Sequence, residues 1–245
     1  MSKIKVIDSI MGSGKTTWAI DYINTHPEKS FVYVTPLLEQ IYRIQENCEA
    51  RDIHDPKQIE GRKINGLNYL LMSGKNIAVT HSTFANANDD TLKYLRDGNY
   101  TLILDEVLDI LIGYNTIASI KISSGDPKLL IDKNVISVDE VGKVTWISND
   151  AYEKTTFADI KRLADRGNLF YLDESLFVWE FPAEVFNAFD EAFVMTYLFD
   201  GSYLKPYFGY SGIDYELMTL VDGELVPYQP TPIGQLQRIR SLINL

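Results

Sequence analysis

The feature that most constrains this chain is a glycine-rich loop that joins an apolar segment to an amphipathic one near the N-terminus. Residues 3–8 are predicted to form a strand and residues 14–24 a helix. Between and across them, residues 9–17 read SIMGSGKTT. This run matches the phosphate-binding pattern G-x-x-x-x-G-K-S/T, with Ser9 in place of the first glycine. A strand, a tight loop and a helix in this order favour an α/β fold with a ligand site at the loop.

Each residue type in the loop suits the binding of a nucleoside triphosphate. Gly12 and Gly14 can adopt positive φ angles and let backbone amides approach phosphate oxygens closely. The helix that begins near Lys15 directs its free N–H groups toward the same anion. Lys15 is expected to contact the β- and γ-phosphates, and the Thr16 hydroxyl is expected to bind Mg²⁺. We therefore predict ATP and Mg²⁺ as cofactors, bound by Gly12, Ser13, Gly14, Lys15, Thr16 and Thr17.

Two adjacent carboxylates provide the second half of the predicted site. Residues 100–105 (YTLILD) read as a buried strand, and Glu106 follows it directly. Ligands collect at the carboxyl ends of parallel strands, so both carboxylates should face the loop. Asp105 is predicted to hold Mg²⁺, and Glu106 to orient or deprotonate the attacking water. With Lys15 as the third catalytic residue, the pair favours hydrolysis, because a small-molecule kinase often lacks such a base.

Short segments that are apolar throughout alternate with amphipathic segments up to about residue 110. Such strands are typical of a parallel sheet that helices cover on both faces. The further strands predicted here are 31–35 and 77–80, and the further helices are 37–48, 65–72 and 83–96. The fold class is therefore predicted to be α/β, a three-layer P-loop fold with a parallel central sheet.

The pattern changes after Gly113. The elements predicted next are a β-hairpin at 135–138 and 144–147, a helix at 158–165, one or two strands within 168–181, a helix starting in 182–189, and a buried strand at 193–199 that returns to the sheet. An ATP-binding domain would then span 1–200, with an α+β insertion within 113–191. Residues 201–245 are predicted to be a C-terminal extension or the start of a second domain, ending in a helical piece at 233–243.

These motifs, in this order, resemble those of superfamily two helicases. GSGKTT is followed by VTP ending at Pro36, VTHSTF beginning at Val79, LDE ending at Glu106, and MTYLF beginning at Met195. The chain looks like the first RecA-like domain of a DEAD/DEAH-type helicase, most like those encoded by phages. The resemblance covers nearly the whole chain to about Gly201. It implies a RecA-like fold, ATP hydrolysis, and movement along nucleic acid in phage replication or recombination.

The resemblance also implies roles for residues outside the loop. The residues implied to contact nucleic acid are Thr35, Pro36, Thr80, His81 and Ser82, and the residue implied to couple hydrolysis to movement is Thr196. Each also has a plainer interpretation as a strand end, a helix cap or an ordinary strand residue. The predicted partner is nucleic acid, held weakly by this chain alone; DNA is favoured, and the sequence leaves the choice between DNA and RNA open.

The family's arginine finger lies in a second RecA-like domain, which needs on the order of 150 residues. Too few residues follow Phe199 to form one, and Arg238 and Arg240 are the only late arginines. We expect a truncated, split or degenerate form whose arginine comes from a second RecA-like domain or a partner. Alone, the chain is expected to bind ATP better than it hydrolyses it.

Composition narrows the setting. A net charge of −11 argues against strong independent affinity for nucleic acid, although a local basic groove would be compatible with it. No apolar run approaches the roughly 20 residues of a membrane span, and the single cysteine fits a reducing cytoplasm, that of the host for a phage protein. Two other functions stay open: a non-catalytic ATP-binding interaction protein, and a P-loop small-molecule kinase with a lid from the basic segment 154–166.

Overall fold

A computed structural model of the protein describes residues 4–107, 111–113, 126–148, 157–172 and 176–229. The chain divides into two compact units. Unit 1 consists of Met1–Leu108 and Ala183–Leu245, and unit 2 of Asp109–Pro182. Unit 2 is therefore inserted into unit 1 along the chain. It follows the strand that ends at Asp105 and precedes the strand of unit 1 that begins at Glu191.

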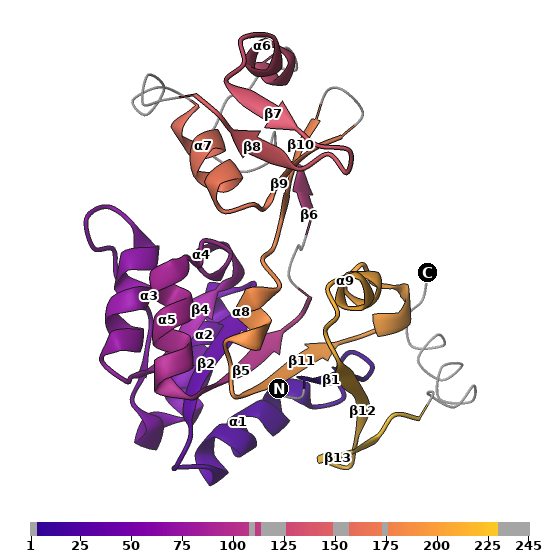
Figure 1. Ribbon diagram of the computed structural model, residues 1–245. Coiled ribbons are helices and arrows are strands. Elements are labelled where there is room, and N and C mark those ends of the chain that lie inside the picture. The colour runs from indigo at the N-terminus through magenta and orange to yellow at the C-terminus, as the bar shows by residue number, and fades with distance from the viewer. Residues whose placement is uncertain (1–3, 108–110, 114–125, 149–156, 173–175, 230–245) are drawn as a thin grey trace. The chain divides into compact units, whose positions relative to one another are not determined.

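Unit 1 is built on an eight-stranded sheet with the strand order β13-β12-β1-β11-β5-β2-β4-β3 (Figure 1). Neighbouring strands are parallel except β12 and β13, which are antiparallel. The strands are β1 (Ile4–Asp8), β2 (Ser30–Thr35), β3 (Ile53–His54), β4 (Asn76–Thr80), β5 (Tyr100–Asp105), β11 (Glu191–Thr196), β12 (Tyr215–Val221) and β13 (Glu224–Pro227). The predicted α/β class with a mostly parallel central sheet is confirmed.

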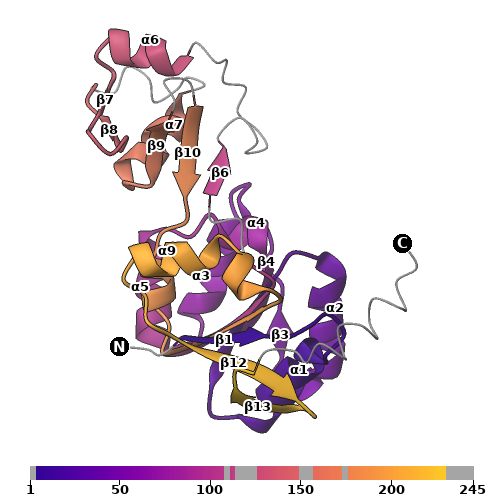
Figure 2. The same cartoon turned by 90° about the vertical axis from the view of Figure 1, so that its right-hand side faces the viewer.

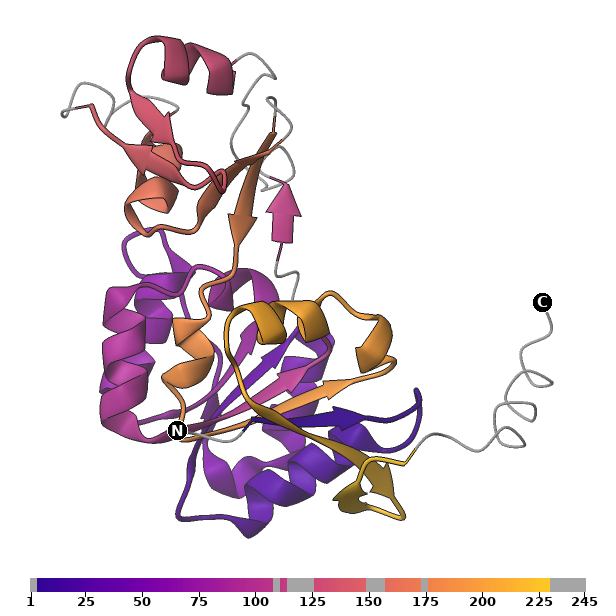
Figure 3. The same cartoon turned by 45° about the vertical axis from the view of Figure 1, so that its right-hand side comes forward.

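Helices lie on both faces of this sheet, an arrangement compatible with a three-layer α/β fold (Figure 3). They are α1 (Lys15–Thr25), α2 (Leu38–Asn47), α3 (Lys63–Met72), α4 (His81–Phe84), α5 (Asp89–Gly98), α8 (Glu184–Asn187) and α9 (Leu204–Tyr210), with 3₁₀ turns η1 (Glu49–Arg51) and η4 (Phe199–Gly201). Helices α1 and α2 share one buried cluster with Tyr33 and Ile103 of the sheet. Because side chains alternate along a strand, Val32 and Val34 face the opposite side. This explains why the central strands are apolar throughout.

The largest differences between predicted and observed elements concern two segments. The helix predicted at 83–96 is divided, because Asn88 caps α5: its side-chain oxygen accepts the Thr91 N–H at 3.0 Å, and the Thr91 hydroxyl oxygen accepts the Asn88 N–H at 3.1 Å. The strand predicted at 193–199 ends at Thr196. The chain turns there at Leu198, whose φ is 60°, and the Asp8 carboxylate accepts the N–H groups of Leu198 and Phe199.

The segment after residue 200 continues the same sheet. Strand β12 pairs in parallel with β1, and β13 folds back on β12 (Figure 2). The sequence gives little sign of this, because Glu216 and Thr219 interrupt the apolar pattern of β12. The boundary expected at residue 200 therefore does not coincide with an edge of unit 1. The helical piece predicted at 233–243 lies outside the described residues.

Unit 2 contains an antiparallel sheet of order β6-β10-β9 and a separate hairpin of β7 and β8. Its elements are β6 (Leu111–Gly113), α6 (Asp126–Asp132), β7 (Ile136–Val138), β8 (Val144–Trp146), α7 (Ala158–Asp165), β9 (Leu169–Leu172) and β10 (Leu176–Glu180). The predicted hairpin is confirmed. In its turn the Asp139 carboxylate accepts the N–H groups of Val141 and Lys143, and Gly142 has a φ of 86°. Among the described residues of either unit, no helix is long and apolar enough to cross a membrane.

Candidate functional site

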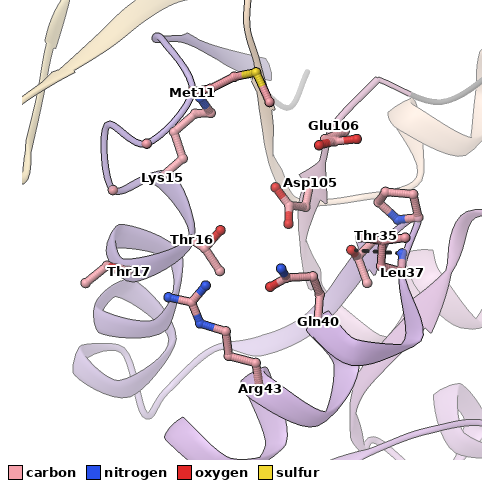
Figure 4. Close-up of a pocket in the computed structure, with 13 residues that line it drawn as sticks. Met11, Lys15, Thr16, Thr17, Thr35, Leu37, Gln40, Arg43, Asp105 and Glu106 are labelled. Carbon is pink, nitrogen blue, oxygen red and sulfur yellow. Dashed lines mark hydrogen bonds between the residues drawn. The ribbon is translucent and has the colours of Figure 1, made fainter. Parts of the chain in front are cut away.

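A cleft of about 400 Å³ lies in unit 1 at the carboxyl ends of β1, β2 and β5 (Figure 4). This volume is within the range of small-molecule sites. The cleft is lined by Met11, Gly12, Gly14, Lys15, Thr16, Thr17, Thr35, Pro36, Leu37, Gln40, Arg43, Asp105 and Glu106. The structure therefore brings the glycine-rich loop and the acidic pair, which are distant in sequence, to one place.

The loop between β1 and α1 requires glycine for its backbone angles. Gly12 has a φ of 77° and Gly14 a φ of 90°, and a Cβ at Gly12 would meet no atom within 4 Å. The need is therefore conformational rather than steric at Gly12. Gly14 is the N-cap of α1, and no side chain caps that end of the helix. The first N–H groups of α1 can therefore donate to an anion in the cleft.

Ser9, which stands at the pattern's first glycine, ties the loop to β12. Its hydroxyl lies 3.0 Å from the Thr219 hydroxyl and accepts the Leu220 N–H at 2.8 Å. All three residues are buried. The serine thus has a structural partner in a strand that sequence analysis did not predict, and no signal in the loop itself pointed to it.

Lys15 bends back over the loop. Its Nζ donates to the carbonyl oxygens of Ser9 at 2.6 Å and Ile10 at 2.9 Å. Burial lowers the pKa of Lys15, while the charges of Asp105, Asp8 and Glu106 act in the opposite direction. An anion that replaced the two carbonyls would give this ammonium a charged partner in a partly desolvated place.

Asp105 is only 9% exposed and accepts a hydrogen bond from the Tyr33 phenol at 2.7 Å. Burial raises the pKa of Asp105; the Tyr33 hydrogen bond lowers it, the Glu106 charge raises it, and Lys15 and Arg43 lower it. Burial and the Asp105 charge in turn hold the pKa of Tyr33 far above its ordinary value, so the phenol keeps its proton and remains a hydrogen-bond donor. Sequence analysis missed Tyr33, because it reads as one more apolar residue of a buried strand.

Glu106 begins the turn after β5 and is exposed at the rim of the cleft. Its φ of 65° is unusual for a residue with a side chain. Its N–H donates to the Met195 carbonyl at 3.0 Å, which holds the turn against β11. Consecutive residues of the acidic pair thus differ in setting: Asp105 is buried and hydrogen-bonded, and Glu106 is open to solvent.

Strand β11 connects the two halves of the site. It lies between β1 and β5 in the sheet. The Thr196 carbonyl accepts the Ser9 N–H at 3.1 Å, and the neighbouring Met195 carbonyl accepts the Glu106 N–H. The Thr196 side chain is buried, with its hydroxyl 3.4 Å from the Tyr197 carbonyl oxygen. Thr196, the predicted coupling residue, therefore lies at the end of β11, whose backbone is hydrogen-bonded both to the start of the loop and to the acidic turn.

The residues implied to contact nucleic acid lie in two places. Thr35 is fully buried at the end of β2, and Pro36 is exposed beside it; both line the cleft itself. Thr80 is the N-cap of α4, and its hydroxyl lies 3.1 Å from that of the exposed Ser82. His81 is hydrogen-bonded through Nε2 to the Asp105 carbonyl oxygen at 3.0 Å. It therefore supports the acidic turn from outside the cleft.

Helix α2 contributes two polar cleft residues, Gln40 and Arg43, that sequence analysis did not single out. The available signal was their position: Ile41 and Ile44 are buried in the core, and Gln40 and Arg43 lie one turn apart on another side of the helix. Met11 and Leu37 also line the cleft without having been singled out from the sequence, and both are largely exposed.

Comparison with known proteins adds a family model and one relative. The model of the YonV middle domain matches residues 117–179, within unit 2. The chain is also similar to the SPbeta prophage-derived uncharacterized protein YonV of Bacillus subtilis strain 168, with 37% identity over 90% of this chain. The chain spans about half of that relative, 55% of its length.

Proposed function

We propose that unit 1 binds and hydrolyses ATP with Mg²⁺, as the RecA-like ATP-binding domain of a nucleic-acid helicase or translocase. One observation carries this proposal: Lys15 and Thr16 of the glycine-rich loop line the same cleft as Asp105 and Glu106. Phosphate binding and water activation need these residue types together. Neither half of the site alone would suffice for hydrolysis.

In this proposal the loop holds the phosphates. The N–H groups at the start of α1 and the Lys15 ammonium donate to phosphate oxygens, and Lys15 exchanges its two carbonyl partners for them. Gly12 and Gly14 keep the loop in the conformation that directs its amides inward. Ser9 fixes the start of the loop against β12, and Thr17 lies at its end.

Thr16 and Asp105 would hold Mg²⁺ between them. Both offer oxygen ligands, which this ion prefers, and one Asp105 oxygen is already oriented by Tyr33. In the described ranges, no group of three or more His, Cys, Asp or Glu side chains could hold a metal by itself. The two residues would therefore bind the ion together with phosphate oxygens and water. When bound, Mg²⁺ neutralises charge on the phosphates.

Glu106 is the general base of this proposal. It is exposed at the cleft rim, next to the buried Asp105 and held in place by Met195 of β11. A carboxylate at this place can accept a proton from the attacking water. The hydrogen bond between Ser9 and Thr196 supports the proposal that ATP hydrolysis is coupled to movement along nucleic acid at the end of β11.

The helicase part of the proposal rests on the order of the motifs and on the fold. A parallel sheet with helices on both faces is compatible with a RecA-like domain. The similarity to a prophage-derived protein supports a phage origin. A role in phage replication or recombination, in the host cytoplasm, is part of the proposal. The arginine finger and most of the nucleic-acid affinity would come from a second RecA-like domain or a partner, and this chain alone would hydrolyse ATP slowly.

Phosphate release by the wild type and by Glu106→Gln, with and without single-stranded DNA, tests this function. We expect slow release that DNA stimulates and that the variant loses, while the variant still binds ATP. Turnover that ignores DNA but needs a small acceptor would indicate a kinase instead. ATP binding without any turnover, even with DNA and at high enzyme concentration, would favour a non-catalytic interaction protein.

A further inference from the structure

Arg43 places a positive charge in the cleft from within this chain. It lies on α2, and Figure 4 shows its guanidinium reaching toward the first turn of α1, beside Thr16. The side chain is exposed, and among the described residues it forms no ion pair or hydrogen bond. Arg43 lines the same cleft as Thr16 and Asp105, the two predicted metal ligands.

Gln40, one turn earlier on α2, provides a second and independent observation. Its side-chain oxygen Oε1 is buried and has no hydrogen-bond partner among the described residues. An unpartnered buried acceptor is costly and rare in folded proteins. Residues three apart on a helix lie on the same side, so Gln40 and Arg43 both face the cleft. An anionic ligand there would accept from the Arg43 guanidinium, and a water molecule bound with it would donate to the Gln40 oxygen.

The rest of α2 fixes this orientation. Ile41 and Ile44 are buried in the cluster shared with α1 and the sheet. Their packing determines which side of the helix faces the cleft, because rotating α2 would expose both isoleucines. The two polar side chains are therefore held at the cleft by the core rather than by contacts of their own.

The charges in the cleft show what Arg43 would add. Its lining contains two cations, Lys15 and Arg43, and two carboxylates, Asp105 and Glu106. A bound triphosphate brings more negative charge than Lys15 and one Mg²⁺ neutralise, and it would lie against those carboxylates. Arginine is well suited to bind a phosphate group, because its planar guanidinium donates two parallel hydrogen bonds.

We infer that Arg43 is an intrachain arginine that binds the terminal phosphate of the triphosphate, and that the Gln40 side-chain oxygen accepts a hydrogen bond from a water molecule in the same complex. This inference rests on the proposed ATP site and deepens it. The terminal phosphate is the relevant one, because Arg43 lines the cleft together with Asp105 and Glu106, the residues proposed to act where that phosphate would lie. The chain would then distinguish ATP from ADP without a second domain.

Calorimetry with Mg²⁺, using ADP and a non-hydrolysable ATP analogue, tests this inference. Arg43→Gln should weaken the analogue by about tenfold to a hundredfold, the usual worth of a hydrogen bond to a charged group, and leave ADP almost unchanged. Arg43→Lys should recover part of the loss, since it keeps the charge without the fork. Arg96→Gln, an exposed arginine on α5, is the matched control and should change neither affinity.

The other outcomes separate this inference from the proposed function. Equal losses for both nucleotides, or no loss for either, would overturn the assignment of Arg43 to the terminal phosphate. A wild type that binds neither nucleotide would refute the ATP site itself. Gln40→Leu gives a second readout: it should weaken the analogue without lowering the melting temperature, because it removes an oxygen that has no partner among the residues the structure describes. A lowered melting temperature would show that Gln40 is structural.

Discussion

The contact between Ser9 and β12 leads to a quantitative prediction about stability. Ser9→Ala removes the acceptor of the Leu220 N–H and the partner of the Thr219 hydroxyl, and these residues are all less than 10% exposed. A buried donor left without an acceptor costs about 1–3 kcal/mol. The Thr219 hydroxyl can rotate toward another acceptor, so most of the loss comes from the Leu220 N–H. We expect a loss of about 2 kcal/mol in the free energy of unfolding.

Thermal unfolding measured by circular dichroism should show this loss as a fall in melting temperature of roughly 4–8 °C. Amide exchange should be faster at Leu220. Ser73→Ala, whose exposed hydroxyl donates to the Tyr69 carbonyl, is the control and should change the stability by less than about 0.5 kcal/mol. In a double-mutant cycle, Thr219→Val should add less in the Ser9→Ala background than in the wild type. An unchanged melting temperature together with unchanged exchange at Leu220 would refute the reasoning.

Two further predictions concern Asp105. Its pKa is raised in the folded protein, so the folded state takes up the proton first as the pH falls toward the ordinary value of 3.8. The ionised group therefore destabilises the fold at neutral pH, and its protonation removes that cost. Asp105→Asn should therefore be more stable than the wild type at pH 7 and lose that advantage as the pH falls toward 3.8. The variant should also bind Mg²⁺–ATP poorly. A melting temperature below that of the wild type at pH 7 would contradict the expected gain in stability. Tyr33→Phe removes a hydrogen bond that lowers the same pKa, so the acid loss of Mg²⁺-dependent nucleotide binding should move to higher pH, as titration calorimetry can measure. An unshifted pH profile would mean that the phenol does not tune this carboxylate.

The strands at the centre of the sheet could be predicted because they carry a strong local signal. Residues of β2 and β5 are buried on both faces, so nearly every position is apolar. The edge is different. β12 pairs with β1 on one side and with the short β13 on the other, and its mixture of polar and apolar residues resembles a loop. A parallel partner more than 200 residues away cannot be inferred from local pattern.

The residues of the candidate site also include some that the sequence identifies and some that it does not. Lys15, Thr16, Asp105 and Glu106 could be identified, because their chemistry depends on short motifs at the ends of strands. Tyr33 could not, because its role depends on one contact with a residue 72 positions away. Arg43 is similar: an exposed arginine on an amphipathic helix is common, and only the packing of α2 shows that it faces the cleft.

The most direct test of the central claim is calorimetric titration of the wild type and Lys15→Ala with ATP in the presence of Mg²⁺. The account predicts one site per chain in the wild type and no detectable binding by the variant, whose melting temperature should stay close to that of the wild type. Equal affinity in the two proteins, or no binding by the wild type, would contradict the assignment of the glycine-rich loop as an ATP site.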